Sequence, residues 1–358
     1  MSEFKTASME NRSSGSPSFT QGLNVGGADV TSGHATSEYH TGATEPSSPA
    51  NGAFWWNGTD LHQYINGKFR ILDANPPPVW TGDKGLFTGR APSKVVDSIS
   101  ISTPGNATTF GNMWFARDRL AGFSNGAIAV WGGGYNDQIW IDYLTIATAG
   151  DATNFGQLTN RREDLAGCSN GFRGIFGGGF EYSSLNIIDY VTIATPSNAQ
   201  DFGDLTAARK QLAACSDGTY GVFGGGNQSG TNDTIDYVTI ATTGNAADFG
   251  NLTQARYQFG SCASLTRGLW AGGYGDYNII DYVTIATPSN ATDFGDLTAQ
   301  RSAVTGCSDL TYGIFAGGKE SFSYVNTIEY VSIATTGNAT DFGDLTVAKG
   351  EFAACSGD

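Results

Sequence analysis

The sequence has little charge, almost no histidine and no long apolar run. Charged residues make up 15% of its 358 residues, and there are only 3 histidines. No stretch approaches the roughly 18 consecutive apolar residues of a membrane-spanning helix. The N-terminus, MSEFKTASMENRSSGSPSF, lacks the apolar core of a secretory signal. We therefore expect neither membrane insertion nor export.

Basic residues are scarce relative to acidic ones. The chain has 19 Lys and Arg against 34 Asp and Glu, a formal net charge of −15. Nucleic acid and anionic membranes both require a basic surface, so we expect neither as a partner.

The five cysteines do not have the spacing of a disulfide framework. Each occupies the same place in successive repeats, within GCS, ACS or SCA: Cys168, Cys215, Cys262, Cys307 and Cys355. Phe123 fills that place in the first repeat. A position that accepts Phe is a packing position. We therefore predict buried free thiols and assembly in a reducing cytoplasm.

Glycine and aromatic residues are abundant, with 50 Gly and 12% aromatics, which favours an all-β chain rich in tight turns. An acid followed by Tyr recurs before a β-branched run, and a degenerate first example is Asp97-Ser98. These acids lie at 97, 142, 189, 236, 281 and 329, which are 45 to 48 residues apart. That period is typical of propeller blades.

One repeat predicts four strands, named a to d outward from the axis: 211–216, 220–225, 234–241 and 249–254. Six b strands are predicted to start near 84, 127, 173, 220, 267 and 312. The last repeat, VAKGEFAACSGD, supplies only an a strand, and the matching b strand is KGLFTGR at 84–90. We therefore predict a six-bladed propeller over 84–358, closed by the C-terminal strand.

The region before the propeller has a different composition. Residues 1–52 are rich in Ser, Thr and Gly, which predicts an extended polar arm that cannot bury a core alone. Residues 53–72 contain two Asn-Gly turns between short aromatic strands, which predicts a three-stranded meander. A Pro-rich spacer then runs to residue 83.

Several motifs that suggest chemistry have a structural interpretation. The DFG triplets lack the other kinase motifs, and the GGG runs lack a following helix and Lys, so we interpret both as turns. The histidines, His34, His40 and His62, all precede the propeller, which removes the imidazole ligands that a copper oxidase would need. We predict no enzyme activity, no metal and no cofactor.

One basic residue precedes the a strand of each blade. The predicted set is Arg117, Arg161, Arg209, Arg256, Arg301 and Lys349. Buried bases are usually paired, so one interpretation is an ion pair with the acid of each repeat. The other is a basic funnel for an acidic ligand.

The b–c loops vary in length and content while the framework barely changes. Most combine aromatic and polar side chains, the mixture that stacks on sugars and hydrogen-bonds their hydroxyls. The candidate ligand-binding residues are Tyr135, Asp137, Trp140, Glu181, Tyr182, Asn227, Gln228, Tyr274, Asp276, Tyr277, Glu320, Phe322 and Tyr324. The alternative is that these loops vary under weak constraint.

The repeats resemble kelch repeats in an Arg before the inner strand, a Gly doublet ending the second and an aromatic in the third. Phe in DFG stands where that family has a Trp. The repeat motif YVTIATTGNATDFGDLT is also similar to repeats in structural proteins of tailed bacteriophages, especially marine ones, and this similarity covers residues 84–358. The FWWNG…YINGKF segment resembles small modules of phage fibres.

This resemblance implies a virion protein, either tail-associated or displayed on the capsid. We expect residues 1–83 to dock onto other virion proteins and the propeller to bind a host-surface glycan. The alternatives are a capsid decoration protein without a ligand, a glycoside-acting enzyme and, least favoured, a cytoplasmic kelch adaptor. The sequence leaves open whether the chain forms a homo-oligomer, because no heptad pattern is present.

Overall fold

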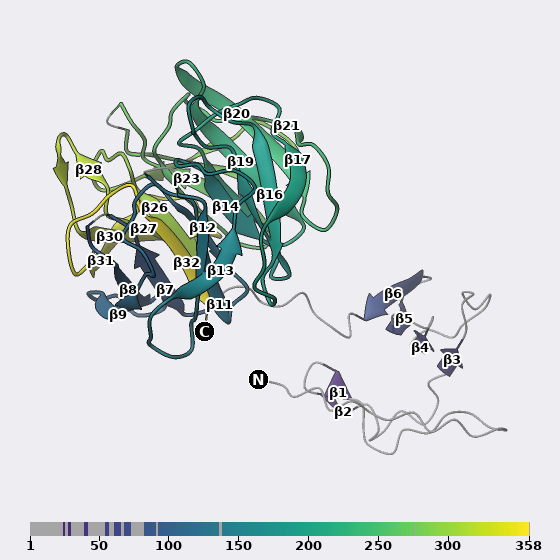
Figure 1. Ribbon diagram of the computed structural model, residues 1–358. Coiled ribbons are helices and arrows are strands. Elements are labelled where there is room, and N and C mark those ends of the chain that lie inside the picture. Colours follow the sequence, from purple (N-terminus) through teal and green to yellow (C-terminus); the bar gives the residue numbers. More distant parts are fainter. Residues whose placement is uncertain are drawn as a thin grey trace. The chain divides into compact units, whose positions relative to one another are not determined.

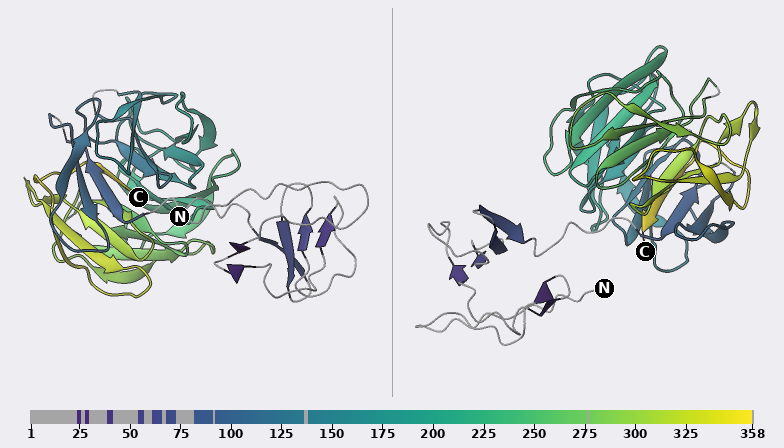
Figure 2. Two further views of the ribbon diagram at one scale, coloured as in Figure 1. Left: turned by 90° about the horizontal axis from the view of Figure 1, so that it is seen from below. Right: turned by 180° about the vertical axis from the view of Figure 1, so that it is seen from behind.

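The structure, a computed structural model, describes residues 82–357 apart from 91, 136, 137 and 276; upstream it describes only the six strands β1 to β6. Within residues 82–357, six four-stranded antiparallel sheets are arranged in a ring (Figure 1, Figure 2). This arrangement is a six-bladed β-propeller, so the predicted fold and blade number are confirmed.

Each blade is ordered a-b-c-d from the axis outward, and the a strands of neighbouring blades lie side by side. Blades 1 and 2 consist of β32 (Ala353–Gly357), β7 (Lys84–Thr88), β8 (Val95–Ser100) and β9 (Thr108–Asn112), and of β10 (Ala121–Ser124), β11 (Ile128–Gly132), β12 (Trp140–Thr145) and β13 (Thr153–Gln157). Blades 3 and 4 consist of β14 (Ala166–Ser169), β15 (Arg173–Gly177), β16 (Ile187–Thr192) and β17 (Gln200–Asp204), and of β18 (Ala213–Ser216), β19 (Tyr220–Asn227), β20 (Thr231–Thr239) and β21 (Ala247–Asn251). Blades 5 and 6 consist of β22 (Gly260–Ala263), β23 (Arg267–Ala271), β24 (Ile279–Thr284) and β25 (Thr292–Asp296), and of β26 (Thr305–Ser308), β27 (Tyr312–Ala316), β30 (Thr327–Ser332) and β31 (Thr340–Asp344). The b–c loop of blade 6 adds a short hairpin of β28 (Lys319–Glu320) and β29 (Ser323–Tyr324).

The chain divides into two compact units, Met1–Pro76 and Pro77–Asp358. In the first, the predicted three-stranded meander is present as β4 (Phe54–Trp56), β5 (Leu61–Ile65) and β6 (Lys68–Leu72). Two features were not predicted: β3 (Tyr39–Thr41), which pairs parallel with β4, and the hairpin of β1 (Asn24–Val25) and β2 (Ala28–Asp29). The rest of the predicted polar arm, 1–52, and the spacer at 73–81 lie outside the described residues.

The C-terminal strand closes the ring, as predicted. Strand β32 pairs antiparallel with β7, with Ala353 opposite Thr88 and Cys355 opposite Leu86. In Figure 1 the yellow β32 lies against the blue β7. Two strand edges that would otherwise be unpaired therefore form backbone hydrogen bonds with each other. Blade 1 is thus built from both ends of the propeller segment.

The core lies between the blades rather than within any one of them. The b strands are buried almost along their whole length, because each packs between two neighbouring blades. The cysteines fill these junctions: a Cβ placed on Gly221 of blade 4 would lie 2.9 Å from Sγ of Cys168 in blade 3. Phe123 occupies the equivalent space over Gly174. All five thiols are buried and free, which confirms the packing interpretation.

Neighbouring blades also meet at their outer strands. There the Gly of the Phe-Gly pair in each d strand packs against the next blade, and an Asn of that next blade accepts a hydrogen bond from the d strand. A Cβ on Gly203 would lie 2.4 Å from the carbonyl oxygen of Gly244 in the next blade. Beside it, Asn245 Oδ1 accepts a hydrogen bond of 3.1 Å from the Asp204 N–H. Asn106, Asn198, Asn290 and Asn338 make the same bond at other junctions. The DFG and sequon-like motifs are therefore structural.

A second set of bonds joins the blades at the axis. One residue in each connector between blades has a left-handed conformation, with φ of 56° to 59°. Each donates its N–H to the carbonyl of its counterpart in the preceding blade, at 2.6 to 3.2 Å. These six residues, which we call the axial ring, are Arg119, Asp164, Gln211, Gln258, Ala303 and Glu351. The ring is continuous, because Arg119 donates to Glu351 across the junction of the two chain ends.

Removal of β32 should unfold the whole propeller rather than one blade. A chain ending at Gly350 loses the buried side chains of Phe352 and Cys355 and two bonds of the axial ring. Several buried apolar side chains are worth about 2–5 kcal/mol each, which approaches the roughly 5–15 kcal/mol of a typical domain. Circular dichroism should show no cooperative thermal transition. Removal of residues 1–76, a separate unit, is the control and should leave the melting temperature unchanged.

Candidate functional site

The b–c loops and the connectors between blades lie at the same end of the propeller. The b strands run toward this end and the c strands away from it, while the d strands lead into the connectors. Backbone bonds join the two sets, for example between Phe180 and Glu163 and between Tyr274 and Tyr257. We call this end the loop face. It contains the axial ring and those predicted ligand-binding residues that the structure describes.

A buried ion pair underlies the loop face in every blade. The base precedes the a strand, the acid lies in the c strand of the same blade, and both are at most 2% exposed. The pairs, at 2.8 to 3.2 Å, are Arg117–Asp142, Arg162–Asp189, Arg209–Asp236, Arg256–Asp281, Arg301–Glu329 and Lys349–Asp97.

The prediction of Arg161 was wrong by one residue. Arg162 is the buried partner of Asp189, at 3.0 Å, whereas Arg161 is 42% exposed in its side chain and pairs with Glu181 at 2.8 Å. The two arginines are adjacent and chemically identical. In every blade the buried base lies six residues before the Cys or Phe of the a strand, as Arg209 does before Cys215. That spacing selects Arg162.

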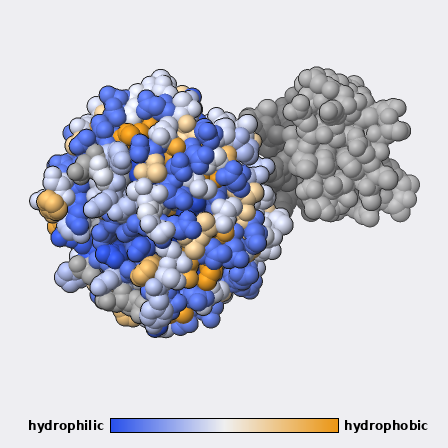
Figure 3. Space-filling view, turned by 90° about the horizontal axis from the view of Figure 1, so that it is seen from above, coloured by the Kyte–Doolittle hydropathy of each residue, from blue (hydrophilic) through white to orange (hydrophobic). Residues whose placement is uncertain are grey.

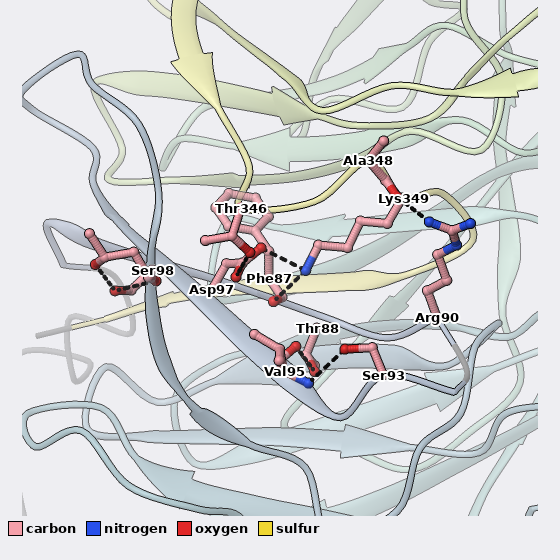
Figure 4. A network of polar contacts seen from close by, with 11 residues as sticks. Phe87, Thr88, Arg90, Ser93, Val95, Asp97, Ser98, Thr346, Ala348 and Lys349 are labelled. Atoms are coloured by element: carbon pink, nitrogen blue, oxygen red, sulfur yellow. Dashed lines mark hydrogen bonds and ion pairs between the residues drawn. The ribbon is translucent and has the colours of Figure 1, made fainter.

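Threonine completes each pair in five of the six blades. Thr206 Oγ1 donates to Asp236 at 2.6 Å, and its N–H donates to the same carboxylate at 3.0 Å. Figure 4 shows the version in blade 1, where Lys349 Nζ lies 2.8 Å from Asp97 and Thr346 Oγ1 donates to Asp97 at 2.6 Å. Because Thr belongs to the connector, the buried acid holds the connector against the blade.

These pairs exclude the basic funnel. A funnel requires positive charge exposed to a ligand, but each buried base faces a carboxylate and a backbone carbonyl of its own blade. Burial lowers the pKa of Arg117, Arg209 and Lys349, and the partner carboxylate opposes that effect. The set is structural, as the paired interpretation predicted.

Four of the predicted loop aromatics are exposed. Tyr135 is 47% exposed, Tyr182 77%, Tyr274 55% and Phe322 96%. Trp140, Tyr277 and Tyr324 are partly buried, as are Glu181, Asn227 and Glu320, whereas Gln228 is exposed. Asp137 and Asp276 lie outside the described residues.

Cations and rings hold several of these side chains in place. The Tyr274 ring stacks on Tyr257 at 4.8 Å and 16°. The guanidinium of Arg119 lies 5.0 Å from the Tyr135 ring centre, and that of Arg161 lies 5.5 Å from the Tyr182 ring. Such contacts reduce the rotamer freedom that a ligand would otherwise have to remove.

The sequence did not predict the polar side chains at the axis. Arg119 donates to Glu351 at 3.2 Å and to Glu163 at 3.0 Å, and Gln258 donates to Glu351 at 3.4 Å. These bonds link side chains of three axial-ring residues and of Glu163, which precedes a fourth. No motif identifies these positions, because the six axial-ring residues share a backbone conformation and not a residue type.

Asp164 is the unusual member of the axial ring. Its side chain is 8% exposed, and its Oδ2 has no hydrogen-bond partner within the described residues. Burial raises the pKa of Asp164 to about 7, partly opposed by the charges of Arg119 and Lys210. The carboxyl therefore titrates near neutral pH.

The channel itself is narrow. Its two adjoining cavities measure about 120 and 90 Å³, room for roughly a few water molecules. Its lining includes one small residue from the a strand of each blade: Gly122, Gly167, Ala214, Ser261, Gly306 and Ala354. A ligand as large as a sugar chain must therefore bind on the loop face and not in the channel.

Within the described residues, no three His, Cys, Asp or Glu side chains are placed to hold a metal ion. In the same part of the chain, no helix is long and apolar enough to cross a membrane. Neither the known protein families nor the curated proteins include a match to this chain.

Asp164 should make stability depend on pH. Its pKa rises from 3.8 to about 7 on folding, so between about pH 4 and 7 the folded state binds more protons, and stability falls as pH rises. Asp164→Asn cannot ionise. At pH 8 its free energy of unfolding should exceed that of the wild type by about 2–4 kcal/mol, measured as a higher melting temperature. Near pH 4 the two proteins should melt at the same temperature.

Asn also suits the left-handed conformation, which would stabilise the variant equally at every pH. Gln211→Asn at the neighbouring axial-ring position measures that effect alone. A constant difference between Asp164→Asn and wild type from pH 4 to 8 would contradict the prediction.

Proposed function

We propose that this chain is a structural protein of a tailed-phage particle whose propeller binds carbohydrate on the host surface. The observation that carries the binding proposal is the set of exposed aromatics on the b–c loops: Tyr135, Tyr182, Tyr274 and Phe322. They lie on one face of a closed ring whose blades are joined by the hydrogen bonds of the axial ring. Rings held on a rigid scaffold beside amide and carboxylate groups suit sugar recognition.

The virion assignment is supported by the sequence of the repeats, which is similar to that of repeats in structural proteins of tailed phages. Residues 1–83 then serve for docking to other virion proteins. The division of the chain after Pro76 is compatible with that role, since the propeller forms a compact unit of its own.

An attachment role fits the loop face better than a catalytic one. Glycoside hydrolysis usually needs two carboxyl groups facing an open site. The six c-strand acids are buried against bases, and Glu163 and Glu351 both accept from Arg119. These acids are held in structural pairs.

Truncation of the loop aromatics should weaken glycan binding without unfolding the propeller. We expect Tyr182→Ala and Tyr274→Ala each to raise Kd about 3- to 10-fold, because a stacked ring contributes roughly 0.5–1.5 kcal/mol. Binding can be measured on an array of host-surface glycans. Phe172→Ala is the control, since Phe172 is 52% exposed but lies in an a–b loop at the opposite end. A wild-type chain that binds no glycan at any salt concentration would favour decoration instead.

Deletion of residues 1–52 should separate folding from assembly. The shortened chain should give a soluble monomer with the same melting temperature, because the propeller does not include that segment. It should no longer join phage particles, as measured by immunoblotting of purified virions. Incorporation at the wild-type level would contradict the docking role.

A further inference from the structure

One junction departs from the arrangement that the other five share. In five blades a Thr three residues before the buried base donates its hydroxyl to the buried acid. The pairs are Thr159–Asp189, Thr206–Asp236, Thr253–Asp281, Thr298–Glu329 and Thr346–Asp97. Between blades 1 and 2 this position is Trp114. The surrounding sequence is otherwise alike: GNMWFAR at 111–117 corresponds to GNLTQAR at 250–256.

The substitution removes from Asp142 the hydroxyl donor that each of its five counterparts has. Asp142 accepts from Arg117 at 3.2 Å, and the N–H groups of Trp114 and Phe115 favour its charged form. Its Oδ2 nevertheless has no hydrogen bond within the described residues, although the side chain is fully buried. Burial raises the pKa of this carboxyl. Loss of a donor to a buried acceptor destabilises the fold, so the buried ion pair does not account for Trp at this position.

Trp114 is part of an aromatic cluster that occurs at this junction alone. Its ring lies 4.4 Å from Phe115 and 5.6 Å from Trp140, and the Trp140 ring stands edge-on to it at 80°. At the other junctions the counterparts of Phe115 are Asn160, Ala207, Gln254, Ala299 and Val347. The counterparts of Trp140 are Ile187, Thr234, Ile279, Thr327 and Val95. All three positions are thus aromatic together only here.

The cluster opens to solvent on the loop face. Phe115 is 39% exposed, and Trp114 and Trp140 are partly buried. Trp140 begins β12 and is fixed by the sheet, so its edge contact sets the orientation of Trp114. Lys94 donates to the Trp114 carbonyl at 2.9 Å and brings an exposed ammonium group beside the rings.

We propose that Trp114, Phe115 and Trp140 form the principal sugar subsite of the loop face, taking one hexopyranose through its apolar C–H face. This subsite rests on the proposed carbohydrate-binding function. The aromatic rings would stack on the sugar, and the Lys94 ammonium would donate to a hydroxyl.

A sugar fits this cluster better than a protein partner. A specific protein interface buries about 800 Å² on each partner. Figure 3 shows one face of the propeller, on which hydrophobic residues form small separate patches among hydrophilic ones. Three neighbouring rings match the size of one pyranose unit, and the exposed Lys94 beside them suits a hydroxylated ligand.

The substitution Trp114→Thr restores the arrangement of the other five junctions and tests the proposal in the full chain. A Thr hydroxyl would reach Asp142, so the melting temperature should rise by about 2–6 °C. Binding to a panel of immobilised glucose and galactose oligosaccharides should fall at least tenfold. Trp114→Phe keeps a ring and should retain binding within about threefold.

A lower melting temperature for Trp114→Thr would show that Trp114 serves the fold, and would overturn the subsite. Unchanged binding by Trp114→Thr, with binding by the wild type, would overturn the subsite and leave the proposed function intact. A wild-type chain that binds none of the oligosaccharides would overturn both. Phe172→Ala, at the opposite end, should change neither quantity.

Discussion

The whole propeller depends on closure of the ring at blade 1. Strand β32 pairs with β7, and at the same place Arg119 donates to Glu351 and completes the axial ring. Each blade packs its b strand between two neighbours, so a gap at one junction would expose the cores of two blades. Closure therefore makes six sheets of four strands, each too small to be stable alone, into one cooperative unit.

Much of this architecture could be predicted from the sequence because the same pattern of residues recurs in every blade. The spacing of the acids, the Gly-rich b strands and the incomplete last repeat determine the blade number and the closure. The fourth strand was placed too late: 249–254 was predicted, but β21 ends at Asn251. The reason is that Thr253 leaves the sheet to donate to the buried Asp281, a bond that strand propensity does not reveal.

Features that depend on geometry without a shared residue type could not be predicted. The axial-ring positions are Arg, Asp, three uncharged residues and Glu, yet all have the same left-handed backbone. The charge of Arg119 and the burial of Asp164 become visible only when the connectors meet at the axis. The b–c loops were correctly identified as the variable part of the loop face, but their neighbours Trp114 and Phe115 belong to a connector and were missed.

The five buried cysteines allow local opening to be measured separately at five blade junctions. Each thiol lies in a different junction, and burial raises the pKa of every one of them above its usual range. An alkylating reagent reacts with the thiolate, so it modifies a given cysteine only after local opening has exposed that side chain. The rate of modification at each position therefore reports how often that part of the ring opens. Mass spectrometry can compare all five junctions without any engineered probe.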